Sequence, residues 1–293
     1  MSDYQLKVRQ QIDRLSSCSL RQIEAEVAGK RVEWYRRQAY APLDPHHPPA
    51  PRMAFERLFF DYMGLSSADL PVIHESQDRI TWLSQNPCPT LEACQALGLD
   101  TRRVCRATYE KSTQAFLSQI DPQLRFLRSY EEIRPFAGHC LESIVRVDFE
   151  QMMRIAIAEA TRSRQEGNKG YGAVVALGQQ ILARTHDTAA TANDPSLHAE
   201  MNAIRAAVQV TGDADLSGAI LFSACEPCPM CSALAVWANV TTIVYGASIE
   251  ETALLGKARI MVSAREIVEK SPNMVEVIGH VLAQDCTNLY RSR

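Results

Sequence analysis

Two short motifs constrain this chain more than any other feature: His198-Ala199-Glu200 and, further along, Pro227-Cys228-Pro229-Met230-Cys231. His198 and Glu200 are two positions apart, which on a regular helix places their side chains about 200° apart around the axis. They can serve one site only at the N-terminal end of a helix. The preceding run Asn193-Asp194-Pro195-Ser196 supplies turn and capping residues that start a helix there.

The two cysteines of the second motif have the spacing of a pair of metal ligands. Cys228 and Cys231 are three apart, on one face of a helical turn, and Pro227 suits a helix start whose free amides favour thiolate over thiol. One imidazole and two thiolates fill three positions of a tetrahedral zinc and leave the fourth for water. We therefore expect Zn²⁺ on His198, Cys228 and Cys231, with Glu200 as the catalytic proton carrier.

An alternative interpretation keeps the zinc but removes the catalysis. Cys225 lies three residues before Cys228 and could act as a fourth ligand, which would close the site. The chain would then be a non-catalytic scaffold with a structural zinc. Glu200 argues against this alternative, because a scaffold has no use for a buried carboxylate beside a metal.

Composition narrows the class of protein. The chain has 293 residues, 46% of them hydrophobic, which is enough for two domains with their own cores. The net charge of −3 gives no general attraction to nucleic acid or to a membrane surface, and a compact polar substrate fits it better. Nine cysteines do not form the dense framework of a small secreted domain, the first thirty residues contain no apolar run behind a basic start, and no stretch approaches eighteen consecutive apolar residues. We expect a cytoplasmic protein without membrane contact.

The two halves of the chain differ in pattern. We expect a mostly α-helical domain of unknown role over 1–145 and a second domain over 146–293, with the boundary between Gly138 and Asp148. The helices expected in the first half cover 6–28, ended by Gly29, then 31–40, 52–62, 91–97 and 101–120. The proline-rich segment 42–51 is expected to be a loop or linker.

The second half alternates helical and strand-like runs, which is typical of an α/β layer structure. Helices are expected over 149–164, 197–210 and 228–238, a hairpin over 172–177 and 180–183 around Gly178, and further strands over 219–224, 241–247 and 275–281. The cysteine pair would follow a strand at its carboxyl end, where open α/β sheets generally place ligands.

From about Phe149 onward the chain resembles the cytidine deaminase-like superfamily, closest to its guanine deaminase and tRNA adenosine deaminase branch. The matching runs are 193–200, 223–231 and Ala235-Val236-Trp237-Ala238. The resemblance implies a three-layer α/β/α domain with a mixed five-stranded sheet, zinc on His198, Cys228 and Cys231, and Glu200 as proton shuttle. It also implies a homodimer, and a reaction in which water converts an aminated heterocycle to the oxo product plus ammonia.

The same resemblance suggests which residues contact the substrate. Cys225-Glu226-Pro227-Cys228 and Trp237 are more similar to guanine deaminase than to the tRNA-editing branch, which favours a guanine-like free base or nucleoside. We expect Asp187, Ala199, Glu226 and Trp237 to bind it. Family members usually carry an asparagine at the place of Asp187 or, with an alignment shifted by one residue, His186. A carboxylate only accepts hydrogen bonds, so Asp187 would select a substrate that offers donors. Trp237 could instead be core on a buried helix.

Two further features stay open at the level of sequence. A tRNA or other nucleic-acid deaminase would need a basic groove, yet residues 185–260 carry only Arg205, Lys257 and Arg259, so nucleic acid is not the favoured partner.

A second metal site in the first half could be formed by His74, His139 and four cysteines, Cys88, Cys94, Cys105 and Cys140. The gaps between these cysteines are irregular, so reduced thiols are the simpler interpretation.

Overall fold

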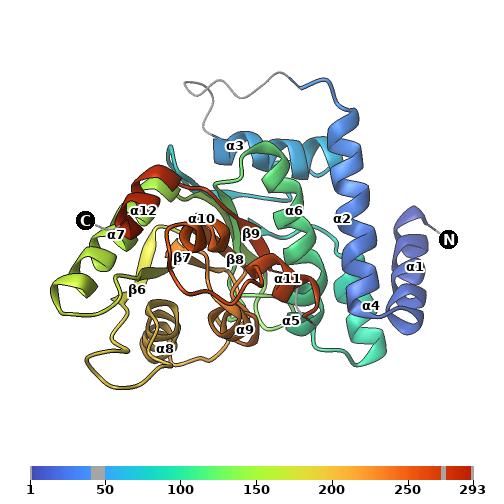
Figure 1. Cartoon of the computed structure of the whole chain (residues 1–293). Helices are drawn as coiled ribbons and strands as arrows, with labels where there is room; N and C mark the ends of the chain where they lie inside the picture. Colours follow the sequence, from blue (N-terminus) through green and yellow to red (C-terminus); the bar gives the residue numbers. More distant parts are fainter. Residues whose placement is uncertain (1, 41–49, 272–274, 292–293) are drawn as a thin grey trace. The chain divides into compact units, whose positions relative to one another are not determined.

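The computed structural model describes residues 2–40, 50–271 and 275–291, and divides the chain into two compact units, Met1–Val147 and Asp148–Arg293 (Figure 1). The two units are described separately. Among the helices in the described residues, none is long and apolar enough to cross a membrane.

The first unit is rich in helix and also contains a four-stranded antiparallel sheet in the order β1-β2-β4-β3. Its helices are α1 (Asp3–Ser17), α2 (Leu20–Arg37), α3 (Ala50–Phe55), α4 (Pro89–Leu97), α5 (Thr101–Val104) and α6 (Lys111–Ile120), with π-helical segments η1 (Glu56–Tyr62) and η2 (Cys105–Glu110). Its strands are β1 (Val72–Glu75), β2 (Arg79–Ser84), β3 (Leu124–Arg128) and β4 (Cys140–Arg146). The sheet was not predicted from the sequence.

Two helix boundaries predicted in this unit are wrong. The helix expected over 6–28 is two helices, because Ser19 and Gln22 form a capping box that starts α2. Gly29 does not end it, and α2 continues to Arg37. Most of the predicted linker, 42–49, lies outside the described residues, whereas Ala50 and Pro51 open α3, where the first turn tolerates proline.

Aromatic side chains contribute much of the core of the first unit. Phe55 and Phe59 are buried, with their rings 4.8 and 5.0 Å from that of Trp82. Cys88, Cys94, Cys105 and Cys140 are free thiols, and in the described part of the chain they form no group with the spacing of a metal site. A second metal site in this unit is therefore not supported.

The second unit is built on a mixed five-stranded sheet in the order β6-β5-β7-β8-β9. The strands are β5 (Gly172–Leu177), β6 (Gln180–His186), β7 (Ala219–Cys225), β8 (Thr242–Ala247) and β9 (Glu276–Ile278). The helices are α7 (Phe149–Gln165), α8 (Ala199–Thr211), α9 (Pro229–Trp237), α10 (Ile249–Leu254), α11 (Ala264–Glu269) and α12 (Ala283–Tyr290). Strand β5 is antiparallel to β6 and β7, whereas β7, β8 and β9 are parallel. The helices and strands predicted for this half are confirmed within a few residues.

Helices cover both faces of this sheet, which gives the expected three layers (Figure 1). Successive strand residues point to opposite faces, so Ala173 and Val175 pack with α8 and α9, while Phe222 meets Phe149 of α7 at 5.5 Å. The parallel step from β7 through α9 to β8 places the start of α9 at the carboxyl end of β7. Helix α8 begins near the same edge, where the site is formed.

Candidate metal centre and active site

His198 occupies the N-cap of α8 with extended backbone (φ −69°, ψ 157°), and its side chain makes no capping hydrogen bond. A turn fixes this position: Asp194 Oδ1 accepts from the Ser196 backbone N–H at 2.8 Å, and the Asp194 carbonyl accepts from Leu197 N–H at 3.2 Å. The predicted turn chemistry therefore lies upstream, and the cap itself is His198. The imidazole is left free for another partner.

The cysteine motif begins the second helix in the same way. Cys228 is the N-cap of α9, Pro229 is its first residue, and Cys231 lies in the first turn. The proline fits because its missing N–H belongs to a turn whose amides have no helical partners. Both thiols therefore lie at the N-terminal end of α9, as the sequence predicted.

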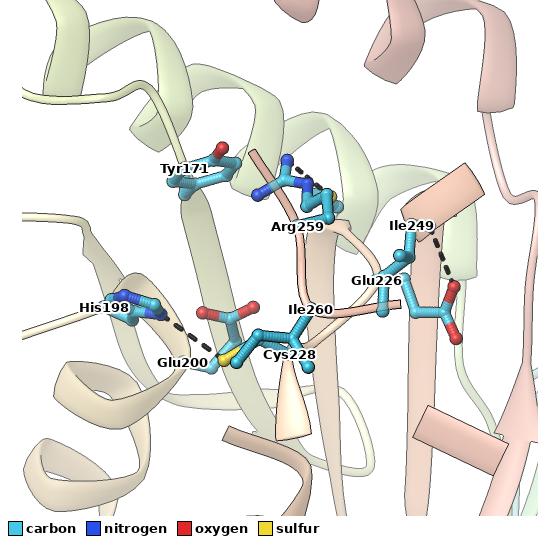
Figure 2. A pocket seen from close by; sticks show the side chains of 9 residues that line it. Tyr171, His198, Glu200, Glu226, Cys228, Ile249, Arg259 and Ile260 are labelled. Carbon is cyan, nitrogen blue, oxygen red and sulfur yellow. Dashed lines mark hydrogen bonds between the residues drawn. The ribbon is translucent and has the colours of Figure 1, made fainter. Parts of the chain in front are cut away.

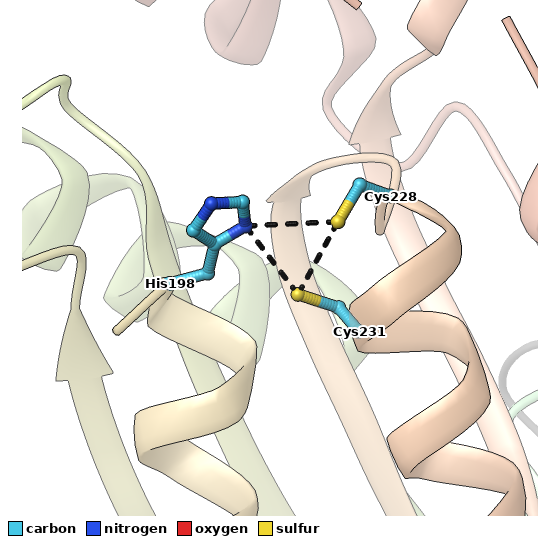
Figure 3. Close-up of side chains that lie close together, drawn as sticks. All are labelled: His198, Cys228 and Cys231. Carbon is cyan, nitrogen blue, oxygen red and sulfur yellow. Dashed lines mark hydrogen bonds between the residues drawn. The ribbon is translucent and has the colours of Figure 1, made fainter. Parts of the chain in front are cut away.

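The structure brings the imidazole and the two thiols into one triangle (Figure 3). His198 Nδ1 lies 3.6 Å from Cys228 Sγ and 3.6 Å from Cys231 Sγ, and the two sulfurs are 3.7 Å apart. Zn–S bonds of about 2.3 Å and a Zn–N bond of about 2.0 Å at tetrahedral angles require separations of about 3.5 Å for N to S and about 3.8 Å for S to S. The three side chains therefore fit one tetrahedral zinc ion.

The electrostatics of the triangle also suit a cation. The hydrogen bond between the two cysteines lowers the pKa of Cys228 to about 4 and raises that of Cys231. The hydrogen bond to Cys228 raises the pKa of His198. The arrangement thus favours the thiolate form of Cys228, which is the form that coordinates zinc.

Glu200 lies beside the triangle, in the first turn of α8. It is only 5% exposed, its Oε1 accepts a 3.0 Å hydrogen bond from the Ser223 hydroxyl, and its Oε2 lies 3.5 Å from Cys231 Sγ. Burial raises the pKa of this carboxyl. A carboxyl with a raised pKa next to a metal site is suited to accept and return a proton near neutral pH.

A pocket opens over these groups (Figure 2). Its lining comprises Tyr171, His198, Glu200, Cys225, Glu226, Cys228, Ile249, Arg259 and Ile260. Tyr171, Ile249 and Ile260 were not predicted, and Arg259 had been noted only as a scattered cation. No local spacing connects these four residues to the motifs, so only the tertiary fold identifies them.

The four predicted substrate contacts lie in different places. Glu226 lines the pocket, but both carboxylate oxygens accept backbone N–H groups, from Ile249 at 3.0 Å and Ala264 at 2.9 Å. Ala199 is fully buried at the start of α8 and is not among the lining residues. Trp237 is 72% exposed and also lies outside the lining. The structure thus places Trp237 neither over the pocket nor in the core, because it ends α9 on the solvent side.

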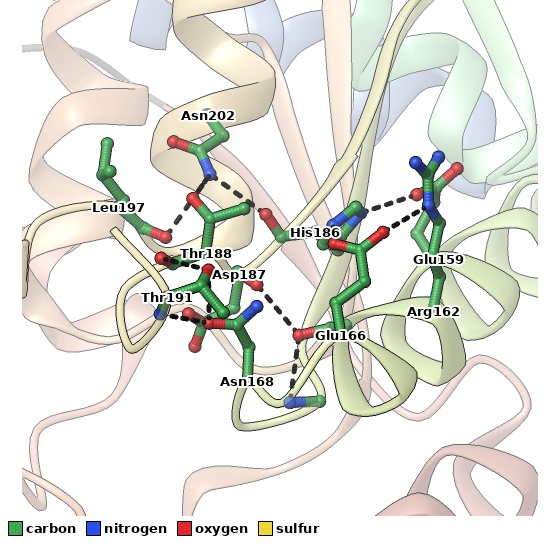
Figure 4. A network of polar contacts seen from close by, with 12 residues as sticks. Glu159, Arg162, Glu166, Asn168, His186, Asp187, Thr188, Thr191, Leu197 and Asn202 are labelled. Carbon is green, nitrogen blue, oxygen red and sulfur yellow. Dashed lines mark hydrogen bonds and ion pairs between the residues drawn. The ribbon is translucent and has the colours of Figure 1, made fainter. Parts of the chain in front are cut away.

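Asp187 is buried just after β6. Its Oδ1 accepts from Ala189 N–H at 2.8 Å, and among the described residues its Oδ2 has no hydrogen-bond partner. It does not line the pocket, and Figure 4 shows it within a polar network that includes Asn168 and His186. A contact between Asp187 and a substrate stays a prediction.

Cys225, the candidate fourth ligand, is directed elsewhere. Its sulfur lies 3.8 Å from Thr252 Oγ1 and accepts a hydrogen bond of 3.4 Å from Arg259 Nη2. It does not belong to the group of side chains whose ligand atoms could share one metal ion. The fourth coordination position of the proposed zinc is therefore left to a ligand other than Cys225.

Fold and site together define a zinc-binding α/β enzyme with a buried carboxylate beside its metal position. Residues 147–247 match the family described as "Cytidine and deoxycytidylate deaminase zinc-binding region". The chain belongs to this deaminase family, whose members hydrolyse C–N bonds, and zinc is its cofactor.

Individual relatives match 38% to 47% of the chain. The guanine deaminase of Bacillus subtilis (strain 168) is 35% identical over 111 residues, which are 38% of this chain and 71% of that protein. The tRNA-specific adenosine deaminase of the same organism is 32% identical over 137 residues, 47% of this chain and 83% of that protein. The X-ray structure of guanine deaminase from Bacillus subtilis, 35% identical, superposes with a TM-score of 0.36 over 38% of this chain and 71% of that one.

Proposed function

We propose that this protein is a hydrolytic deaminase of an amino-substituted purine or pyrimidine-like heterocycle, with a guanine-like free base or nucleoside favoured. The observation that carries the proposal is the triangle of His198, Cys228 and Cys231, spaced for tetrahedral zinc, with the Glu200 carboxyl beside it in a pocket. The guanine deaminase relative supports the choice of ring.

His198, Cys228 and Cys231 would hold the zinc. The ion supplies the Lewis acidity that makes water a nucleophile near neutral pH. The neighbouring Glu200 is placed to manage the protons, because its carboxylate is buried and held by Ser223.

The reaction then needs two proton transfers through Glu200. The carboxylate takes a proton from water while the water oxygen bonds to the carbon that carries the amino group, and it gives that proton to the adjacent ring nitrogen. The same carboxylate next takes the proton of the hydroxyl group that has formed on this carbon and gives it to the amine. The C–N bond then breaks and ammonia leaves. The product carries a carbonyl where the substrate carried an amine.

The deciding experiment is a screen of bases, nucleosides and nucleotides for ammonia release by the purified, zinc-loaded chain. The matched variant is Glu200→Gln, which keeps the shape of the side chain and removes its basicity. We expect about one zinc per chain in both proteins and at least a 10³-fold loss of kcat in the variant. A Gln variant as active as the wild type would disprove the mechanism.

A second candidate substrate is the adenosine of a tRNA anticodon loop, because the tRNA-specific adenosine deaminase relative matches over 83% of its length. Including a synthetic anticodon stem-loop in the screen separates the two. Inosine formation in the stem-loop, without ammonia release from small heterocycles, would favour RNA editing.

We further propose that the enzyme acts as a cytoplasmic homodimer. All nine cysteines are free, which supports a reducing compartment, and exposed apolar side chains such as Trp237 and Leu254 suit a subunit contact. Light scattering of the purified chain tests the dimer, and a monomer at micromolar concentration would contradict it.

A further inference from the structure

Arg259 brings a positive charge to the wall of the pocket (Figure 2). It lies on the loop between α10 and α11 and is half-buried. Its Nε donates to Thr252 Oγ1 at 2.9 Å, its Nη2 donates to Cys225 Sγ at 3.4 Å, and its Cζ lies 4.9 Å from the ring centre of Tyr171. These contacts hold the guanidinium in one place.

None of the three partners supplies a negative charge. Thr252 is neutral, and burial raises the pKa of Cys225 to about 12 and also raises that of Tyr171, so both keep their protons at neutral pH. No carboxylate within the described ranges forms an ion pair with Arg259. Glu226, which shares the pocket wall, uses both oxygens on the backbone of Ile249 and Ala264.

A half-buried guanidinium without a counter-charge is costly, because partial desolvation is not repaid by an ion pair. Guanidinium has five N–H donors, and the bonds to Thr252, Cys225 and Tyr171 leave further donors for another acceptor. Its planar donors match carboxylate and phosphate oxygens. The missing partner is thus expected to be an oxyanion that enters the pocket.

We propose that Arg259 determines substrate specificity by binding a carboxylate or phosphate group of a small heterocycle while the aminated ring lies against Glu200. This inference rests on the proposed deaminase function and narrows its substrate class. A guanine-like ring would then carry its charge as a phosphate, as in a nucleoside monophosphate, or as a ring carboxylate. The neutral guanine-like base or nucleoside favoured above would then be a weaker substrate than its charged counterpart, which revises that part of the proposed function.

The kinetic test uses matched pairs that differ only in charge. One arm compares nucleosides with their monophosphates, and the other compares an aminopyrimidine carboxylate with its carboxamide, so the arms distinguish the two sources of oxyanion. We expect kcat/KM of the zinc-loaded chain to be at least about 100-fold higher for the charged member in one arm. Arg259→Gln should remove most of this preference, and Arg259→Lys should restore part of it.

A binding test separates this inference from the proposed chemistry. Zinc-loaded Glu200→Gln, alone and combined with Arg259→Gln, is titrated calorimetrically with the nucleosides, the monophosphates and the carboxylate pair. Arg265→Gln is the control, because Arg265 is exposed, donates to the Val277 carbonyl at 3.0 Å and does not line the pocket. We expect Arg259→Gln to weaken binding of the charged ligand at least tenfold and the control to leave it unchanged.

Each outcome decides one question. Absence of ammonia release with Arg259-dependent binding would overturn the deaminase function and leave the oxyanion site standing. Equal affinity or equal kcat/KM for charged and neutral members, or a preference unaffected by Arg259→Gln, would overturn the inference. Arg259-dependent activity confined to an RNA stem-loop would also overturn it, because the oxyanion would then belong to a nucleic acid.

Discussion

The Ser223 hydroxyl donates a 3.0 Å hydrogen bond to Glu200 Oε1, and this bond links the central strand β7 to the first turn of α8. Both side chains are buried, and Ser223 is fully so. The carboxylate that the mechanism requires is thus oriented by the sheet through Oε1, while its Oε2 faces the Cys231 thiol. Ser223 acts as a positioning residue.

Replacing Ser223 with alanine tests this role. The variant loses one hydrogen bond to a charged group, so we expect kcat to fall about tenfold while zinc content and KM stay close to wild type. Steady-state kinetics and metal analysis of the same preparation provide the measurement. Ser232→Ala is the matched control, because the Ser232 hydroxyl is buried in α9 but donates to the Pro227 carbonyl. Equal kcat losses in the two variants would assign Ser223 a purely structural role.

The contacts of Cys225 predict the composition of the zinc shell. Its sulfur faces Thr252 and Arg259, whereas Cys231 belongs to the metal triangle. Cys225→Ser should therefore keep about one zinc per chain, and Cys231→Ser should lose most of it. X-ray absorption of the wild type should show zinc bound by two sulfurs, one nitrogen and the oxygen of water. Three sulfurs bound to the zinc would instead support the alternative of a closed structural site in a non-catalytic scaffold.

The sequence predicts the metal triangle because each ligand's place at the start of its own helix is set locally. Cys228 and Cys231 share one helical turn, and His198 is fixed by the turn just before α8. Arg259 and Tyr171 reach the pocket from a loop and from the residue before β5, so their place depends on the packing of elements far apart in sequence. Trp237 shows the same limit, since a helical pattern cannot tell which side of α9 will be covered.

The fold, like the site, was predicted from the sequence only in part. Long runs with clear periodicity, such as α7 and the β5–β6 hairpin, were identified correctly, whereas the sheet of the first unit was not. Its strand β1 is exposed throughout, so it has no alternation of buried and exposed residues to detect. The predicted stop at Gly29 failed because glycine ends a helix when it adopts a left-handed conformation, and Gly29 keeps a helical one.

This error provides a stability prediction. Gly29 lies inside α2, is exposed, and a Cβ added there would meet no atom within 4 Å. Gly29→Ala should therefore raise the free energy of unfolding by about 0.5–1 kcal/mol, because alanine loses less backbone entropy in a helix. Chemical denaturation followed by circular dichroism measures it. Gly98→Ala is the contrasting control, since Gly98 has a φ of +65° at the end of α4 and should destabilise. A destabilised Gly29→Ala would contradict the continuous helix α2.

The network around His186 predicts a pH dependence of stability (Figure 4). Glu166 Oε2 lies 2.8 Å from His186 Nε2, and Glu166 Oε1 accepts from Arg162 Nε at 2.9 Å. The hydrogen bond to His186, and then that from Arg162, lower the pKa of Glu166. A carboxyl with a depressed folded-state pKa contributes stability above its unfolded pKa of about 4.3, and this contribution is lost as the pH falls through the folded value.

Glu166→Gln should therefore destabilise the chain at pH 7, and the difference from wild type should shrink below about pH 4. Urea denaturation of both proteins at pH 7, 5 and 3 gives the comparison. Glu150→Gln is the control, because Glu150 pairs with Arg154 at 2.9 Å on the exposed face of α7, where ion pairs contribute little. A difference that persists unchanged at pH 3 would show that the loss does not come from the charge of Glu166.

A variant of Glu226 tests whether this carboxylate has a structural role or contacts the substrate. Its two oxygens accept the buried N–H groups of Ile249 and Ala264, which start α10 and α11. Glutamine offers one oxygen, so in Glu226→Gln one buried N–H would face an amide N–H. We expect the free energy of unfolding to fall by about 1–3 kcal/mol and KM to change less than threefold, as measured by urea denaturation and steady-state kinetics. Glu250→Gln, exposed on α10, is the control. Unchanged stability with a large rise in KM would instead give Glu226 the substrate-binding role that its motif predicts.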